Sequence, residues 1–152
     1  QQVITHMDIS HPKILYGSET GTAEDVAFKI SSVLHRCHVD CSISCMEDYD
    51  ISVLPTERFV IFVVSTTGDG EAPSTMRQFW RFLLRKSLPK DALSGMQFAV
   101  FGLGDSGYDK FNAVARKLQM RLKQLGGTPA LDIGLGDDQA GYGYLSALDP
   151  WV

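Results

Sequence analysis

One segment constrains the fold of this chain more than any other. In Arg58–Ser65 (RFVIFVVS) six consecutive residues are β-branched or aromatic, and polar positions do not alternate with apolar ones. A strand with one face in water alternates, whereas a parallel strand covered by helices on both faces is apolar throughout. The segment therefore predicts the central strand of a buried parallel sheet.

Shorter apolar runs predict four more strands, at Pro12–Tyr16, Val39–Cys45, Gln97–Phe101 and Thr128–Leu135. Helix-spaced apolar residues lie between them, and the glycines at 126 and 127 predict the end of the last helix. This alternation predicts an α/β fold, a five-stranded parallel sheet with helices on both faces and ligands beyond the carboxyl ends of its strands. The three apolar stripes are Ala23, Val26, Ala27, Ile30 and Leu34; Met76, Phe79, Trp80 and Leu83; and Phe111, Val114, Ala115, Leu118, Leu122 and Leu125.

The composition excludes several classes of partner. A chain of 152 residues is one domain's worth, and its 14 basic and 18 acidic residues leave a net charge of −4. That balance argues against nucleic acid or an anionic membrane as the main partner. No apolar run approaches the roughly 20 residues of a membrane span, and no signal peptide is recognisable. Three cysteines, Cys37, Cys41 and Cys45, favour free thiols in a reducing compartment, so we expect a cytoplasmic protein with no nucleic-acid and no membrane partner.

The two ends of the chain suggest a domain taken from a longer protein. Gln1 is not an initiator residue, and His6-Met7 is typical of a tag junction. We interpret residues 1–6 as an added tail and residues 7–152 as the domain. The sequence stops at Trp151-Val152 without a closing helix, so we expect more chain beyond it.

The loop after the first predicted strand favours a phosphate site. Residues 17–23 (GSETGTA) combine two glycines and three hydroxyls, and they run directly into a helix whose first amides are unpaired donors. A P-loop would need a lysine and a longer spacing, so a terminal monophosphate is favoured over a nucleoside triphosphate. The alternative is that Ser18 or Thr20 only caps the helix.

Two further loops converge on the same predicted edge. Residues 102–107 (GLGDSG) match the glycine pattern of dinucleotide sites, but that pattern belongs to the first strand and not the fourth. Tyr108 and Phe111 follow and place aromatic rings beside the phosphate loop. Residues 65–73 add hydroxyls and flexible glycines, so the three loops together suit a phosphorylated cofactor with a flat ring.

These motifs resemble a known family. The runs at 18–23, 65–70, 102–108 with Phe111-Asn112, and 135–138 resemble the FMN site of the flavodoxin-like domain of NADPH-dependent diflavin oxidoreductases, which are related to cytochrome P450 reductase. Residues 79–82 (FWRF) and 147–151 (ALDPW) resemble the cytosolic branch that serves iron-sulfur assembly. The resemblance implies a flavodoxin-like fold with strand order 2-1-3-4-5.

The resemblance also implies roles for individual residues. Residues 18–23 would hold the FMN phosphate, Tyr108 would stack on the isoalloxazine ring, and Gly68 would present its carbonyl to flavin N5. Thr67 stands where many diflavin reductases carry a second stacking aromatic residue. The full set of implied FMN-binding residues is Ser18, Glu19, Thr20, Gly21, Thr22, Ala23, Thr66, Thr67, Gly68, Leu103, Gly104, Asp105, Tyr108, Phe111, Asn112 and Asp138.

The implied function is electron transfer. The domain would relay single electrons from an FAD/NADPH reductase domain of the same protein to an iron-sulfur protein acceptor, and alone it would not oxidise NADPH. Two alternatives remain: a free-standing flavodoxin-type electron carrier, and a flavin-free interaction module on the same fold. A receiver-type signalling domain is disfavoured, because its phosphoacceptor aspartate would end the third strand, where this chain has Ser65-Thr66-Thr67.

Charged and metal-ligating side chains give weaker signals. Arg77, Arg81 and Arg85 recur every fourth residue, which predicts a solvated helix face or, second, a dock for an acidic partner. His35, Cys37, His38 and Cys41 are ligand types for zinc, but they straddle a helix end and a strand start, so we predict no metal site and place Cys41 and Cys45 in the core. Seven of the 18 acidic residues fall in the cofactor loops, where they would steer a basic partner or simply reflect polar loops. They are Glu19, Asp69, Glu71, Asp105, Asp109, Asp137 and Asp138.

Overall fold

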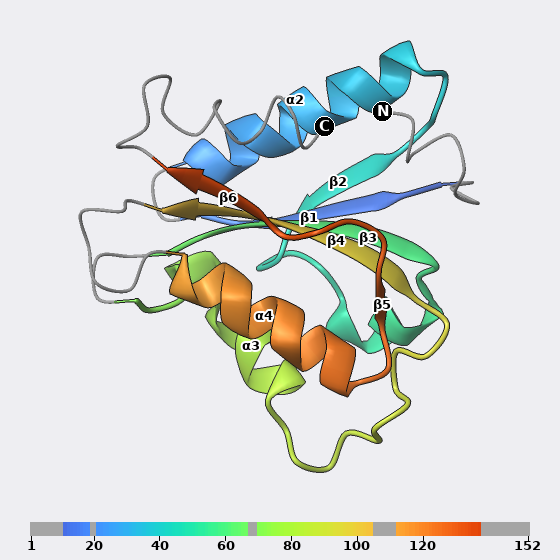
Figure 1. The fold of residues 1–152 in the computed structure, drawn as a ribbon, viewed down its shortest axis with the longest axis vertical. Helices are drawn as coiled ribbons and strands as arrows, with labels where there is room; N and C mark the ends of the chain where they lie inside the picture. Colours follow the sequence, from blue (N-terminus) through green and yellow to red (C-terminus); the bar gives the residue numbers. More distant parts are fainter. Residues whose placement is uncertain (1–10, 19–20, 67–69, 105–111, 138–152) are drawn as a thin grey trace.

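The computed structural model describes residues 11–18, 21–66, 70–104 and 112–137 (Figure 1). A twisted parallel sheet lies between helix α2 on one face and helices α3 and α4 on the other. No helix of these described residues is long and apolar enough to cross a membrane. In chain order, the elements are β1 (Lys13–Gly17), α2 (Thr22–Arg36), β2 (Ser42–Cys45), η1 (Ile51–Thr56), β3 (Phe59–Ser65), η2 (Ser74–Met76), α3 (Arg77–Leu83), β4 (Gln97–Gly104), α4 (Ala113–Gln124), β5 (Thr128–Pro129) and β6 (Gly134–Asp137).

The strand order confirms the predicted topology. The sheet runs β2-β1-β3-β4-β5, all pairs are parallel, and β6 also pairs with β4. β3 lies at the centre and pairs with β4 over its full length, from Phe59 opposite Gln97 to Ser65 opposite Leu103. Six of its seven residues are buried, as the uninterrupted apolar run predicts.

The predicted fifth strand, Thr128–Leu135, is divided in the structure. Its first part, β5, places Pro129 opposite Phe98, and its second part, β6, places Gly134 opposite Phe101. β4 advances three residues between these pairs, while the other strand advances five. Two extra residues therefore leave the ladder between β5 and β6, and both parts still pair with β4 in the predicted place.

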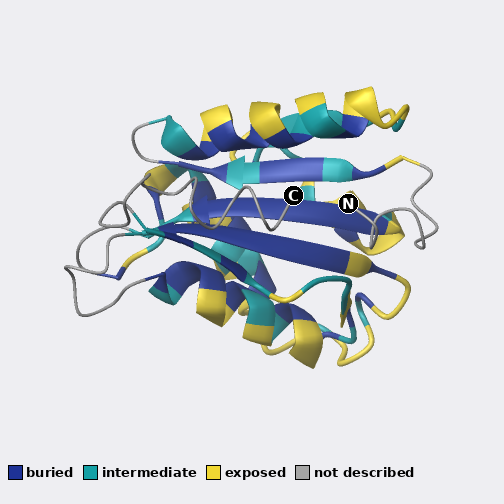
Figure 2. Cartoon of the chain, turned by 45° about the horizontal axis from the view of Figure 1, so that its top comes forward, coloured by how far each residue is buried: buried dark blue, intermediate teal, exposed yellow. Residues whose placement is uncertain are grey.

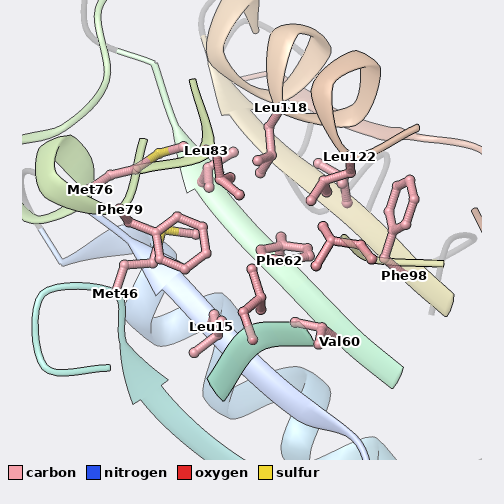
Figure 3. Close-up of a cluster of buried hydrophobic side chains, with 14 of the residues drawn as sticks. Leu15, Met46, Val60, Phe62, Met76, Phe79, Leu83, Phe98, Leu118 and Leu122 are labelled. Atoms are coloured by element: carbon pink, nitrogen blue, oxygen red, sulfur yellow. The ribbon is translucent and has the colours of Figure 1, made fainter. Parts of the chain in front are cut away.

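Two apolar cores fill the space between the sheet and its helices. Helix α2 buries all five residues of its predicted stripe against one face (Figure 2). On the other face, Phe62 lies at the centre of the larger core, between side chains of α3 and α4 (Figure 3). Its ring meets that of Phe79 edge-on, with centroids 6.1 Å apart. Burial of this kind contributes roughly 1.5–3 kcal/mol per large apolar side chain.

The other stripes are confirmed with small differences. Val114, Ala115, Leu118, Leu122 and Leu125 are buried, and Gly126 ends the helix with φ 94°. Met76, Phe79 and Leu83 are buried as well, whereas Trp80 is only half-buried, at the border between core and solvent. Phe111 lies outside the described residues. Cys41 packs half-buried against the α2 core, and Cys45 is also half-buried.

Candidate functional site

The parallel strands bring their carboxyl ends to one edge of the sheet. β1, β3, β4 and β6 end there at Gly17, Ser65, Gly104 and Asp137. Helices α2 and α4 begin at the same edge (Figure 1). Because loops at the carboxyl ends of parallel strands are where α/β proteins bind ligands, this edge is the candidate site.

A tight turn leads from β1 into α2. The Gly21 amide donates to Ser18 Oγ over 2.8 Å, and Gly21 adopts the left-handed conformation, with φ 93° and ψ −5°. Gly21 is the residue before the helix, and as a glycine it has no side chain to cap the first turn. Ser18 Oγ bonds the amide of this residue, so the hydroxyl closes the turn that leads into α2. Thr20, the other candidate cap, lies outside the described residues.

A distant threonine holds this turn in place. The Ser18 amide donates to Thr75 Oγ1 over 2.9 Å, and the same hydroxyl donates to the Ser18 carbonyl over 3.0 Å. Thr75 belongs to η2, 57 residues further along the chain, and sequence analysis missed it. No local pattern marks such a contact, because one hydroxyl before a short helix is common.

The first turn of α2 is also tied to β1. Tyr16 donates its hydroxyl hydrogen to Glu24 Oε2 over 2.6 Å. This bond to the Glu24 carboxylate, with burial as a smaller cause, raises the pKa of Tyr16 above its ordinary range. The bond fixes the direction in which the helix leaves the turn.

Asn112 joins three elements at the start of α4. It is fully buried, lies in the left-handed region at φ 52°, and donates from Nδ2 to the Gly136 carbonyl of β6 over 3.0 Å. Its Oδ1 has no partner among the described residues. Gly102 and Gly104 of β4 make room for it, since a Cβ on Gly102 would lie 2.6 Å from Asn112 Oδ1 and 2.5 Å from Ala115 Cβ.

Thr66 connects the end of β3 to the start of α4, next to Asn112. Its amide donates to the Leu103 carbonyl over 3.0 Å, and its Oγ1 accepts from the Val114 amide over 3.1 Å. Val114 lies in the first turn of α4. A threonine that follows β3 therefore satisfies one of the amides that a helix start leaves unpaired.

The structure describes half of the predicted FMN-binding residues. Ser18, Gly21, Thr22, Ala23, Thr66, Leu103, Gly104 and Asn112 all lie at this edge, on the turn before α2, the ends of β3 and β4, and the start of α4. Outside the described residues lie Glu19, Thr20, Thr67, Gly68, Asp105, Tyr108, Phe111 and Asp138.

The described residues have the chemistry that FMN requires. A phosphate monoester needs several hydrogen-bond donors, and the start of α2 offers first-turn amides with the hydroxyls of Ser18 and Thr22. Asn112 Oδ1 is a buried acceptor for which no described residue supplies a donor. Glycines at the end of β4 keep side chains away from this acceptor. FMN would therefore be bound through neutral hydrogen-bond donors, and the glycines at the end of β4 would let it approach the backbone closely.

The remaining predicted groups behave differently. Arg77, Arg81 and Arg85 are exposed, as a solvated helix face requires. Of the predicted acidic rim, the structure describes Glu71, which is exposed, and Asp137, which is half-buried. Glu19, Asp69, Asp105, Asp109 and Asp138 lie outside the described residues. Within the described part of the chain, no three metal-ligating side chains gather into a site, and Cys41 Sγ instead lies 3.3 Å from Ser31 Oγ.

Comparisons with known proteins agree with this geometry. Residues 14–151 match the family model described as flavodoxin. The chain is 50% identical over 139 residues to NADPH-dependent diflavin oxidoreductase 1 of Xenopus laevis, covering 91% of this chain and 23% of that protein. It is 48% identical to the Mus musculus protein of the same name, covering 96% of this chain and 24% of that one. A solved flavodoxin variant from Pseudomonas aeruginosa superposes with a TM-score of 0.76 at 28% identity, over 93% of each chain. The chain thus spans about a quarter of the curated relatives and nearly all of the solved flavodoxin.

Proposed function

Because the chain belongs to the flavodoxin family, we propose that it is the FMN-binding domain of an NADPH-dependent diflavin oxidoreductase. In this role it relays single electrons from an FAD- and NADPH-binding reductase domain of the same protein to an iron-sulfur protein acceptor in the cytoplasm. The fold, the family and FMN as its cofactor are common to flavodoxin-like domains. The place in a longer reductase and the acceptor are the proposal.

One observation carries the proposal furthest. The chain is 50% and 48% identical to the Xenopus laevis and Mus musculus diflavin oxidoreductases across 91% and 96% of its own length, against 28% identity for the solved flavodoxin. The likeness therefore extends well beyond what the shared fold requires. The iron-sulfur acceptor rests on the resemblance of residues 79–82 and 147–151 to the cytosolic branch of that family.

The described residues of the site bind and orient the cofactor. FMN, when bound, accepts and releases electrons one at a time. The turn from Ser18 to Ala23 holds its phosphate through neutral donors, and the positive end of α2 favours that anion. Thr75 keeps the turn in position through Ser18. Leu103, Gly104 and Asn112 form the side of the pocket at the end of β4 and the start of α4.

The rest of the binding set follows from the motifs. By their resemblance to the family motifs, Glu19 and Thr20 would complete the phosphate turn, Thr67 and Gly68 would lie beside the ring, and Tyr108 would stack on it. Asp105, Phe111 and Asp138 would contribute to the rest of the pocket. Since Thr67 stands where many diflavin reductases carry a second stacking aromatic residue, the other ring face would be either open or covered by another domain.

An absorbance spectrum tests FMN binding. The chain mixed with FMN and passed over a desalting column should keep the visible flavin bands. Tyr108→Ala should lose roughly 1–3 kcal/mol of FMN affinity, taking base-aromatic stacking as a guide, whereas Tyr108→Phe should keep most of it. Circular dichroism provides the control for folding. A colourless chain that ignores added FMN would favour the flavin-free interaction module.

Two further measurements test the place of the domain in the reaction. The chain alone, loaded with FMN, should not oxidise NADPH, and sustained turnover would contradict a separate reductase domain. Stopped-flow transfer from the reduced chain to a [2Fe–2S] protein should slow with added salt, because the Debye length falls from about 30 Å at 0.01 M to about 10 Å at 0.1 M. Neutralising Asp69 and Glu71 should lower the association rate without changing FMN content.

The second candidate, a free-standing flavodoxin, is supported by the 93% coverage of the solved protein, and a natural gene product of this length would favour it.

A further inference from the structure

Helices α3 and α4 form a layer whose charge is opposite to that of the chain. Neither helix contains aspartate or glutamate, although acidic residues outnumber basic ones by 18 to 14 overall. Both helices lie on the same face of the sheet (Figure 1). Six of the 14 basic residues fall on these two short helices, and they are Arg77, Arg81, Arg116, Lys117, Arg121 and Lys123.

A groove crosses this layer near the candidate FMN site. Its volume is about 310 Å³, and it lies between the segment at residues 70–72, α3 and the first turns of α4. Trp80 and Ala72 provide an apolar surface within it. The charged residues that line the groove are three cations and one carboxylate: Arg77, Arg81, Lys117 and Glu71. Trp80 is half-buried and packs against the larger core, so its ring has a fixed place.

The basic residues of the layer divide into two groups. Arg121 is used by the fold, because its Nη2 donates to the Arg85 carbonyl over 3.1 Å and its Nε donates to the Leu83 carbonyl. It thereby ties the end of α3 to α4. Arg77, Arg81 and Lys117 are exposed and pair with no carboxylate among the described residues. Among the described residues, these three cations make no hydrogen bonds like those of Arg121.

We propose that this groove is the docking site for an acidic, extended segment of a partner protein, which places an apolar side chain against Trp80. Exposed cations around an apolar aromatic surface match an acidic peptide with one apolar anchor, since aromatic anchors supply affinity and bordering charges supply orientation. The cations come from two helices and are all exposed, which suits several carboxylates along a strand of peptide. A single phosphate would need them to converge on one buried point.

The groove and the predicted acidic rim are neighbouring surfaces that share one residue, Glu71. Gly70 and Glu71 border the groove and directly follow the loop at 67–69, which the motifs assign to FMN. A partner docked in the groove would therefore lie beside the loop that the motifs assign to FMN. The predicted acidic rim would instead attract a basic surface of a partner. The docking proposal depends on charge and shape of described residues and holds with or without FMN.

A titration followed by NMR tests the proposal. The isotopically labelled chain, loaded with FMN, is titrated with a short synthetic peptide of Asp and Glu around a central Leu. We expect the indole N–H of Trp80 and the amides of Arg81 and Lys117 to shift, with an affinity that falls as salt rises. The same peptide with Asn and Gln in place of Asp and Glu should bind at least about tenfold more weakly.

Charge-reversal variants locate the interaction. Arg81→Glu with Lys117→Glu should weaken peptide binding about tenfold, because two attractions become repulsions. Lys29→Glu with Arg36→Glu makes the same change in net charge on α2, across the sheet, and should leave binding within about twofold. Trp80→Leu should also weaken peptide binding, because it removes the aromatic surface. The NMR signals of core residues should be unchanged in Arg81→Glu, which shows that this variant is still folded. Flavin absorbance of each variant shows whether FMN is still bound, so loss of cofactor and loss of docking are separate results.

Several outcomes would overturn the proposal. One is peptide shifts confined to the carboxyl edge of the sheet, and another is an equal loss of affinity in the α2 control variant. Inorganic phosphate that displaces the peptide and causes the same shifts would show a small-anion site instead. Absence of any shift at Trp80 up to millimolar peptide would refute docking at this groove.

Discussion

Two helices begin at the same edge of the sheet, and their first turns are built in opposite ways. α2 begins after Gly21, a glycine with no side chain to cap the helix. α4 begins after the fully buried Asn112, and Thr66, the residue that follows β3, accepts a hydrogen bond from the Val114 amide of its first turn. Both starts carry the same partial positive charge. The start of α4 is thus joined to the end of β3 by a side chain, whereas the start of α2 follows a glycine, so the residues around a helix start decide how firmly it is tied to the rest of the fold.

The largest effect should come from closing the space beside α4. Gly102→Ala would put a Cβ 2.5 Å from Ala115 Cβ and 2.6 Å from Asn112 Oδ1. We expect a loss of about 2–3 kcal/mol in the free energy of unfolding, because a packed joint has no room for the methyl group. Urea denaturation measures it. Gly95→Ala is the matched control, since nothing lies within 4 Å of that position, and an equal loss in both variants would contradict the steric explanation.

Removing the side chain of Asn112 should reduce the free energy of unfolding by somewhat less. Asn112→Ala removes the donor to the Gly136 carbonyl and places alanine at φ 52°. We expect a loss of about 2 kcal/mol from the unpaired carbonyl and the left-handed backbone together. Asn112→Gly also removes the hydrogen bond but accepts that backbone without strain, so the difference between the two variants isolates the cost of the left-handed conformation, and the difference between wild type and Asn112→Gly reports the hydrogen bond. Identical unfolding midpoints for wild type and Asn112→Gly would show that the bond to Gly136 contributes nothing.

In the turn before α2, a substitution should cost stability through backbone conformation and not through packing. Gly21→Ala meets no atom within 4 Å, but it puts a side chain at φ 93°. A cost of about 1 kcal/mol follows from the left-handed conformation alone. Differential scanning calorimetry measures the change, and FMN affinity should fall with it if this turn holds the phosphate. An affinity for FMN that survives while stability drops would separate the turn from the phosphate site.

The smallest effect concerns the bond that orients α2. Tyr16→Phe removes the hydrogen bond to Glu24, and we expect a loss of up to about 1 kcal/mol at neutral pH, since the pair is partly exposed. The bond raises the pKa of Tyr16 in the folded state. Its stabilisation is therefore full below the unfolded pKa of about 10 and is lost as the pH rises beyond it. Thermal melts between pH 8 and pH 11 should show a steeper alkaline decline for wild type than for Tyr16→Phe, and parallel declines would exclude this role.

Local patterns predicted most of the fold and a smaller part of the site. The uninterrupted run at β3 and the stripe on α2 are properties of neighbouring residues, so the sequence shows them directly. The contacts of Ser18 with Thr75 and of Thr66 with Val114 join residues 57 and 48 positions apart. Such pairs depend on how elements meet in space, and single hydroxyls carry no pattern that identifies them. Asn112 was predicted beside FMN, and its role as a buried joint appears only when β4, β6 and α4 are assembled.

The division of the fifth strand has a consequence for how the protein behaves at high concentration. An outer strand offers unpaired amides and carbonyls to any other chain, and long flat edges promote aggregation. Here the outer strands β2, β5 and β6 contain four, two and four residues, whereas the inner strands β3 and β4 contain seven and eight. The two residues that leave the ladder interrupt the edge where a second molecule would otherwise pair. Among the described strands, the irregularity between β5 and β6 thus leaves no long flat edge of the kind that favours pairing between molecules.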